Sequence, residues 1–178
     1  MYLEIRQEQL EDYEFTESVV KLAFANAEYS DKKEHELVSR IRKSNVFIPK
    51  LSLVATDKDN GKILGHILLS KIKISKDNQL AESLALAPVS VLPEYQNKGV
   101  GGLLITEALK EAQEIGYDSV VVLGHPAYYP KFGFKKASLW GITAPFDVPD
   151  ETFMALELSE NALSKVSGVV EYPSVFFE

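Results

Sequence analysis

The order of apolar and polar positions predicts strands and helices in alternation. Residues 2–6 alternate like a short strand, whereas residues 9–24 and 31–44 carry apolar side chains at helical spacing. Asp31 is the expected N-cap of the second helix, and Thr16 is a candidate cap inside the first. Residues 51–74 form two strand-like runs around Asp59-Asn60-Gly61, which predicts a β-hairpin because Asn-Gly tolerates positive φ.

The second half of the chain continues with a buried strand at 82–92 and a helix at 100–115 that Gly116 closes. A second buried strand follows at 118–124, and further strands are predicted at 151–158 and within 166–177. An antiparallel meander thus feeds a β-α-β unit, so the predicted fold is α/β (α+β) with a mixed, mostly antiparallel sheet. We expect one domain over residues 1–158, with residues 159–178 as a C-terminal extension packed on it. That extension either completes the sheet or pairs with a second subunit in a homodimer.

Composition narrows the function classes. The chain is 46% apolar and 25% charged. Its net charge of −7 argues against mainly electrostatic binding to nucleic acid or to an anionic membrane. No apolar stretch approaches the about 20 residues of a membrane helix, and the N-terminus does not resemble a secretory signal. The sequence has no cysteine, and its three histidines lack metal-ligand spacing. We therefore expect a cytoplasmic protein without a metal, a nucleic-acid partner or a membrane partner.

A glycine-rich stretch, QNKGVGG at residues 96–102, lies between the buried strand and the helix. Backbone N–H groups at a helix N-terminus have no intrahelical acceptor, and the helix dipole favours an anion there. The spacing fits neither GxxxxGK[ST] nor GxGxxG, so a nucleoside-triphosphate loop and a dinucleotide fold are disfavoured. The stretch is therefore either a phosphate-binding turn or a tight turn that binds nothing.

The same residues carry a family resemblance. Gln96 to Gly101 match Q/R-x-x-G-x-G/A, which is the acetyl-CoA loop of the GCN5-related N-acetyltransferase (GNAT) superfamily. Val91-Leu92-Pro93 precedes the loop as in that family, and Tyr129 to Phe134 match its Y-x-x-x-G-F element. Together with the element order over residues 1 to about 158, the sequence is similar to the YhbS-like branch of this superfamily.

The resemblance implies a GNAT-like sheet with a β-α-β acetyl-CoA-binding core and a role for individual residues. The pantetheine arm would bond to the backbone of the strand before the glycine loop, and the pyrophosphate would rest on the loop. A main-chain N–H near Val91 would stabilise the oxyanion, and Tyr129 would protonate the leaving thiolate, with Tyr128 as the alternative. The implied cofactor-binding residues are Val89, Ser90, Val91, Gln96, Asn97, Lys98, Gly99, Val100, Gly101 and Gly102.

The implied function is an N-acetyltransferase that moves the acetyl group of acetyl-CoA, its cosubstrate, to a primary amine of a small molecule or peptide. The amine would attack directly in a ternary complex. The alternatives are a non-catalytic acyl-CoA-binding sensor or interaction module, and transfer to another acceptor group. His125 stands where many members have asparagine, so it either bonds the pantetheine, shuttles a proton or caps a strand end.

The base that activates the amine is left open by the sequence. Glu28, Glu34 and Glu82 are carboxylates in suitable regions, but the pattern favours a surface position for each, and a water chain is the alternative to a base. His66 lies in an apolar strand and is interpreted as a sheet histidine whose hydrogen bonds are satisfied.

Overall fold

The computed structural model describes residues 2–178, which divide into two units. Unit 1 comprises the chain up to Leu69 together with Ala87–Glu111, and unit 2 comprises Ser70–Leu86 and Ala112–Glu178. Three elements run through both units, namely β3 (Ile63–Lys76), β4 (Gln79–Val91) and α3 (Val100–Glu114). None of the helices within residues 2–178 has the length and apolar character needed to cross a membrane.

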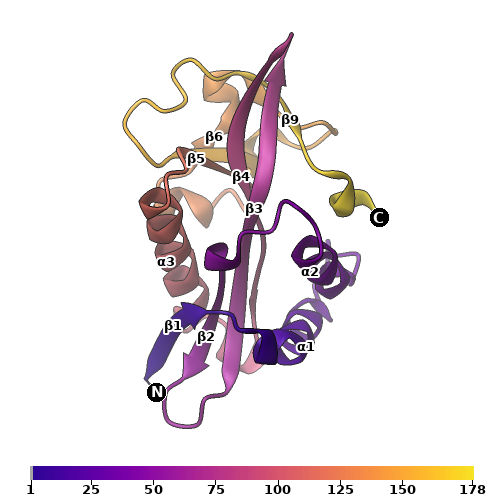
Figure 1. Cartoon of the computed structure of the whole chain (residues 1–178), viewed down its shortest axis with the longest axis vertical. Helices are drawn as coiled ribbons and strands as arrows, with labels where there is room; N and C mark the ends of the chain where they lie inside the picture. The colour runs from indigo at the N-terminus through magenta and orange to yellow at the C-terminus, as the bar shows by residue number, and fades with distance from the viewer. Residues whose placement is uncertain (1) are drawn as a thin grey trace. The chain divides into compact units, whose positions relative to one another are not determined.

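Unit 1 contains an antiparallel sheet and two neighbouring helices. Strand β1 (Leu3–Gln7) pairs with β2 (Ser52–Asp57), β2 pairs with β3, and β4 lies next to β3. Helices α1 (Tyr13–Phe24) and α2 (Glu34–Arg42) lie side by side (Figure 1). The predicted hairpin is confirmed, and Gly61 in its turn adopts φ 74°, a conformation that glycine adopts without strain.

The core of unit 1 joins α1 to the sheet. Val19 of α1 packs with Val54 of β2 and Leu64 of β3, and Leu92, which follows β4, closes the cluster. Residues 52–56 of β2 are all buried, as expected for a strand covered on both faces.

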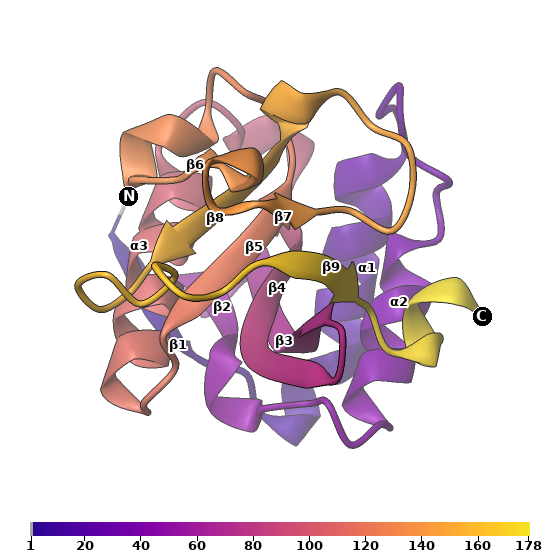
Figure 2. The ribbon, with the colours of Figure 1, turned by 90° about the horizontal axis from the view of Figure 1, so that it is seen from above.

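The strands that belong to unit 2 are mostly short. Strand β4 pairs in parallel with β5 (Ser119–Leu123), at Leu84↔Val120 and Ala85↔Val121. Strand β8 (Phe153–Glu157) pairs antiparallel with β5 and with the two-residue strand β6 (Lys135–Lys136). Figure 2 shows β9 (Gly168–Glu171) beside the distal half of β3, to which it is antiparallel, and β7 (Ile142–Thr143) pairs in parallel with β9. The predicted mixed, mostly antiparallel sheet is therefore confirmed.

The core of unit 2 includes the end of the chain. Leu163 and Val170 are buried in one cluster with Ile74, Val121 and Phe153. Residues 159–178 thus supply apolar side chains to this unit.

Two local expectations were wrong, and the predicted terminal strand is confirmed over part of its range. Helix α2 begins at Glu34, so Asp31 is not its N-cap; Asp31 Oδ1 accepts a hydrogen bond from the Lys33 N–H instead (2.8 Å). Thr16 lies inside α1 and is buried, and so does not begin a helix. The terminal strand covers only Gly168–Glu171, and the chain then forms a 3-10 turn at Ser174–Phe177.

Candidate functional site

The glycine-rich loop leads directly into α3, as its sequence predicts. The Leu103 N–H donates to the Gly99 carbonyl (3.1 Å), and this bond closes the first turn of α3. The N–H groups of Val100, Gly101 and Gly102 therefore precede the hydrogen-bonded ladder and have no acceptor within the helix. Gly99 adopts φ 86° in the left-handed region, and a Cβ there would meet nothing within 4 Å. The loop is thus an open turn with N–H donors at its helical end.

Side chains around the loop fix its position and its charge. Gln96 Nε2 donates to the Val91 carbonyl (3.0 Å), which ties the loop to the end of β4. Lys98 and Lys62 place their ammonium groups 5.7 Å and 5.6 Å from the centre of the Tyr95 ring. Lys98 belongs to the loop itself, so its charge adds to that of the helix dipole in favouring an anion at the start of α3.

A cleft of about 400 Å³ opens beside the end of β4. One wall is the end of α1 and the residues after it, between Leu22 and Ala27. The other wall contains Val89, Ser90 and Val91 of β4, followed by Pro93 and Gln96. Four of the residues predicted to bind the cofactor, Val89, Ser90, Val91 and Gln96, thus line one cavity within unit 1.

In unit 2, Tyr129 begins a 3-10 turn that runs to Phe132. Its ring is 8% exposed and makes edge-on contacts with Tyr128 (5.2 Å between centroids) and Phe134 (5.7 Å). Gly124 makes room for this ring, because a Cβ at position 124 would lie 2.3 Å from Tyr129 Cε2. Burial, with a smaller contribution from Tyr128, raises the pKa of Tyr129 to about 12, so its hydroxyl is protonated at neutral pH.

His125 precedes this 3-10 turn in the chain and is exposed. Its Nδ1 accepts a hydrogen bond from the Ala127 N–H (3.1 Å), and its carbonyl accepts one from the Tyr128 N–H (3.1 Å). Because Nδ1 is an acceptor, the neutral ring carries its proton on Nε2.

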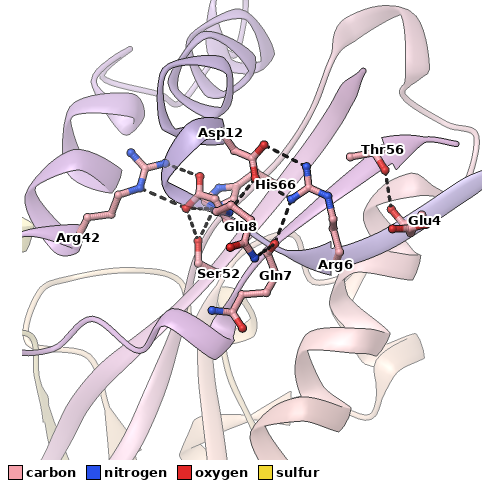
Figure 3. Close-up of polar contacts among 10 residues, drawn as sticks. Glu4, Arg6, Gln7, Glu8, Asp12, Arg42, Ser52, Thr56 and His66 are labelled. Carbon is pink, nitrogen blue, oxygen red and sulfur yellow. Dashed lines mark hydrogen bonds and ion pairs between the residues drawn. The ribbon is translucent and has the colours of Figure 1, made fainter. Parts of the chain in front are cut away.

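A buried polar network, which the sequence did not predict, lies in unit 1 (Figure 3). Arg42 donates to both carboxylate oxygens of Glu8, from Nε (3.2 Å) and Nη2 (2.5 Å). Ser52 Oγ donates to Glu8 Oε1 (2.8 Å) and lies 2.9 Å from His66 Nε2. The side chains of Arg42 and Glu8 are 4% and 0% exposed, so this ion pair is shielded from water.

The protonation states of the network follow from burial. Complete burial lowers the pKa of His66 to about 4, although the carboxylate of Glu8 acts in the opposite direction. Burial alone would raise the pKa of Glu8, yet the facing His66 and the hydrogen bonds from Arg42 lower it. At neutral pH the network therefore holds an anionic Glu8, a cationic Arg42 and a neutral His66.

His66 corrects one interpretation of the sequence. Its Nε2 has a partner, but its Nδ1 is buried without one, so the histidine is only half satisfied. Among the candidate bases, Glu28 and Glu82 are exposed, whereas Glu34 is half-buried and accepts a hydrogen bond from Ser30. Residues 2–178 contain no group of three or more histidine, aspartate or glutamate side chains arranged to hold a metal ion.

Sequence comparisons place the chain among acetyltransferases. Residues 49–136 match the family model of the acetyltransferase (GNAT) domain. The uncharacterized N-acetyltransferase YjhQ of Escherichia coli K12 is 38% identical over 120 residues, covering 67% of this chain and 65% of YjhQ. The uncharacterized N-acetyltransferase YhbS of the same strain is 30% identical over 154 residues, covering 86% of this chain and 89% of YhbS.

Solved structures agree with the sequence comparisons. The crystal structure of YhbS from Escherichia coli in complex with CoA superposes with a TM-score of 0.86 at 29% identity, covering 99% of this chain and 92% of that one. A GNAT family acetyltransferase from Brucella melitensis in complex with acetyl-CoA has a TM-score of 0.79 at 32% identity, with 98% of both chains covered. With its fold, its glycine loop and these relatives in agreement, this chain belongs to the GNAT family of acetyltransferases.

Proposed function

We propose that this chain is an acetyl-CoA-dependent N-acetyltransferase that acetylates a primary amine of a small molecule or peptide. The observation that carries the proposal is the glycine-rich start of α3 beside the cleft at Val89–Val91, both within unit 1. Two relatives of the same fold have been crystallised with CoA and with acetyl-CoA, which supports the same ligand here. The net charge of −7 favours a cationic acceptor through long-range steering.

The cofactor would be held mainly by backbone groups. The pyrophosphate would accept hydrogen bonds from the N–H groups between Asn97 and Gly102, where the helix dipole and Lys98 add favourable charge. The pantetheine amides would bond to the main chain of Val89–Val91 as an added strand does. Such contacts depend little on side chains, so this segment of β4 still packs through its own side chains.

The amine would attack the thioester directly while both substrates are bound. The Val91 N–H would donate to the developing oxyanion, and Tyr129 would give its proton to the leaving thiolate. The raised pKa of Tyr129 suits a donor, because the hydroxyl keeps its proton over the whole neutral range. His125 would present its Nε2–H, since its Nδ1 is engaged by the Ala127 N–H.

Calorimetry with CoA, followed by thiol release from acetyl-CoA across a panel of amines, tests the proposal. We expect CoA to bind and at least one amine to release free thiol. Gly101→Val should weaken CoA binding by about tenfold or ~1.4 kcal/mol, because a branched side chain would stand between the loop N–H groups and the diphosphate.

Leu103→Val is the matched control, since Leu103 is exposed on the same helix. It should bind CoA as the native chain does. Absence of CoA binding at millimolar concentration would refute the proposal, whereas tight binding without turnover of any acceptor would favour a non-catalytic acyl-CoA sensor.

A further inference from the structure

The cleft of unit 1 is bordered by uncharged residues. Charged residues make up 25% of the chain, yet none of the ten described residues that line the cleft has a charged side chain. Seven of the ten are apolar, namely Leu22, Ala23, Phe24, Ala27, Val89, Val91 and Pro93. Ligand sites with such a lining hold the apolar part of a ligand and orient it with a few polar groups.

The lack of charge extends along both walls of the cleft. Residues 22–27 (LAFANA) and residues 83–93 (SLALAPVSVLP) contain no charged side chain. A charged residue borders each run at both ends, and none of these four lines the cleft. The four are Lys21, Glu28, Glu82 and Glu94. The cleft therefore has no counter-charge on either wall for an ionised group of a ligand.

Leu22 shows which kind of group the cleft favours. It lies in the last turn of α1 and lines the cleft, and it is 55% exposed. Val19 and Val20 of the same helix are buried in the core, so α1 presents Leu22 on a different face. An apolar group that covered Leu22 would remove apolar surface from water, which is favourable. An ammonium or carboxylate in the same place would lose water without gaining an opposite charge.

The three polar residues of the lining are neutral. Gln96 Nε2 already donates to the Val91 carbonyl (3.0 Å). Ser90 Oγ is buried without a hydrogen-bond partner, and Asn26 is exposed. Neutral oxygens of this kind can accept a hydrogen bond from an amine N–H, but they do not balance a second ionised group.

The volume of the cleft sets the size of the group. About 400 Å³ holds about a dozen non-hydrogen atoms, because a water molecule takes about 30 Å³ in the liquid. In the proposed reaction the pantetheine arm lies along the β4 wall, so the acetyl thioester shares this space with the acceptor. The wall formed by residues 22–27 is then left to contact a small acceptor.

We propose that the cleft holds the uncharged, apolar body of a small primary amine, so that the acceptor is an alkylamine or arylalkylamine with a single ionised group. This inference rests on the proposed acetyl transfer and names its class of acceptor. Leu22, Ala23 and Phe24 determine the specificity by contacting the apolar body. The net charge of −7 attracts the ammonium from a distance, whereas the cleft selects the group to which the amine is attached.

Three amines of equal length test the inference by thiol release from acetyl-CoA. Pentylamine, 4-aminobutanol and putrescine (1,4-diaminobutane) differ at the far end, which is a methyl, a hydroxyl or an ammonium group. We expect kcat/KM to be about 100-fold higher for pentylamine than for putrescine, with 4-aminobutanol between them. Equal values for the three amines, or a preference for putrescine, would overturn the inference.

A carboxylate introduced into the wall should change this preference. Ala23→Asp should raise kcat/KM for putrescine relative to pentylamine by about tenfold, because the far ammonium gains a counter-charge. Ala27→Asp adds the same charge from the turn after α1 and should act in the same direction. Ala25→Asp is the matched control, since Ala25 is the exposed C-cap residue of α1 and does not line the cleft. The same ratio of the two amines in all three variants would contradict the assignment of this wall.

A second measurement does not need turnover. Saturation-transfer NMR, recorded with and without CoA, should show transfer from the protein to the terminal methyl group of pentylamine. The transfer should persist in Ala25→Asp and fall in Ala23→Asp. No transfer in the native chain, or equal transfer in both variants, would refute the subsite. Transfer without acetylation of any amine would instead keep the subsite and reject the proposed reaction.

Discussion

The buried pair Arg42–Glu8 allows a quantitative prediction. Arg42→Met keeps most of the side-chain volume but removes both hydrogen bonds to Glu8, at 2.5 Å and 3.2 Å, and the contact of the guanidinium with the Tyr13 ring at 4.0 Å. The Glu8 side chain is 0% exposed, so its carboxylate would lose its counter-charge without gaining water. Breaking a buried pair in this way costs about 3–5 kcal/mol, a large part of the stability of an ordinary domain.

Urea unfolding at pH 7 measures the loss, with Arg6→Met as the control. Arg6 binds Asp12 (2.6 Å) but is 33% exposed, so its loss should cost about 1 kcal/mol. Adding Glu8→Gln to Arg42→Met should recover part of the stability, because a neutral amide needs no cation. Equal losses for Arg42→Met and Arg6→Met, or no recovery in the double variant, would refute the reasoning.

The loss of stability in Arg42→Met should also depend on pH. In the native chain the lowered pKa of Glu8 means that its contribution is present above its unfolded pKa of 4.5 and is lost as the pH falls through the folded pKa. Without Arg42, burial raises the pKa of Glu8 and the carboxyl group becomes neutral in acid. The difference in free energy of unfolding between Arg42→Met and the native chain should therefore become smaller as the pH is lowered. A difference that grows would contradict the pairing of an ionised Glu8 with Arg42.

Three further outcomes are expected. His66 has a pKa of about 4 when folded and 6.5 when unfolded, so the free energy of unfolding should fall by up to about 3 kcal/mol between pH 6.5 and pH 4. In urea unfolding, His66→Gln should show a weaker dependence of this free energy on pH. A native chain whose stability does not change over this pH range would contradict the prediction. Gly124→Ala should cost about 1–3 kcal/mol and lower the Tm, because its Cβ would lie 2.3 Å from the Tyr129 ring, and an unchanged Tm would show that the ring moves freely. Tyr129→Phe should lower kcat by about 10²–10⁴ with acetyl-CoA affinity intact, and unchanged turnover would remove Tyr129 from the mechanism.

Local features of the fold could be predicted because their causes lie within a few residues. Asn60-Gly61 forms the β2–β3 turn since glycine accepts φ 74°, and the periodicity of residues 100–115 places α3 within one residue of its observed end. The position of the glycine loop follows from the same local order of strand, loop and helix. The start of α2 could not be predicted, because the Asp31 carboxylate bonds the Lys33 N–H in a turn that competes with capping.

Partners far apart in the chain were beyond the sequence pattern. Glu8 lies among polar residues, and this local pattern predicts a surface carboxylate. In the structure it is buried and bonded to Arg42, 34 positions away, and to Ser52, 44 positions away. The two-residue strands β6 and β7 form because β8 and β9 provide partners for their backbone hydrogen bonds. Two residues are too few to show a hydrophobic periodicity in the sequence.

The sequence by itself determined the elements, the turn chemistry and the glycine loop, because these depend on φ preferences and side-chain spacing within a few positions. The tertiary structure decided which charges lose their water and which polar atoms meet. Glu8, Arg42, Ser52 and His66 come from four separate segments, so their burial and protonation exist only once those segments pack. Desolvation is a property of the packed neighbourhood, and no single stretch of chain contains it.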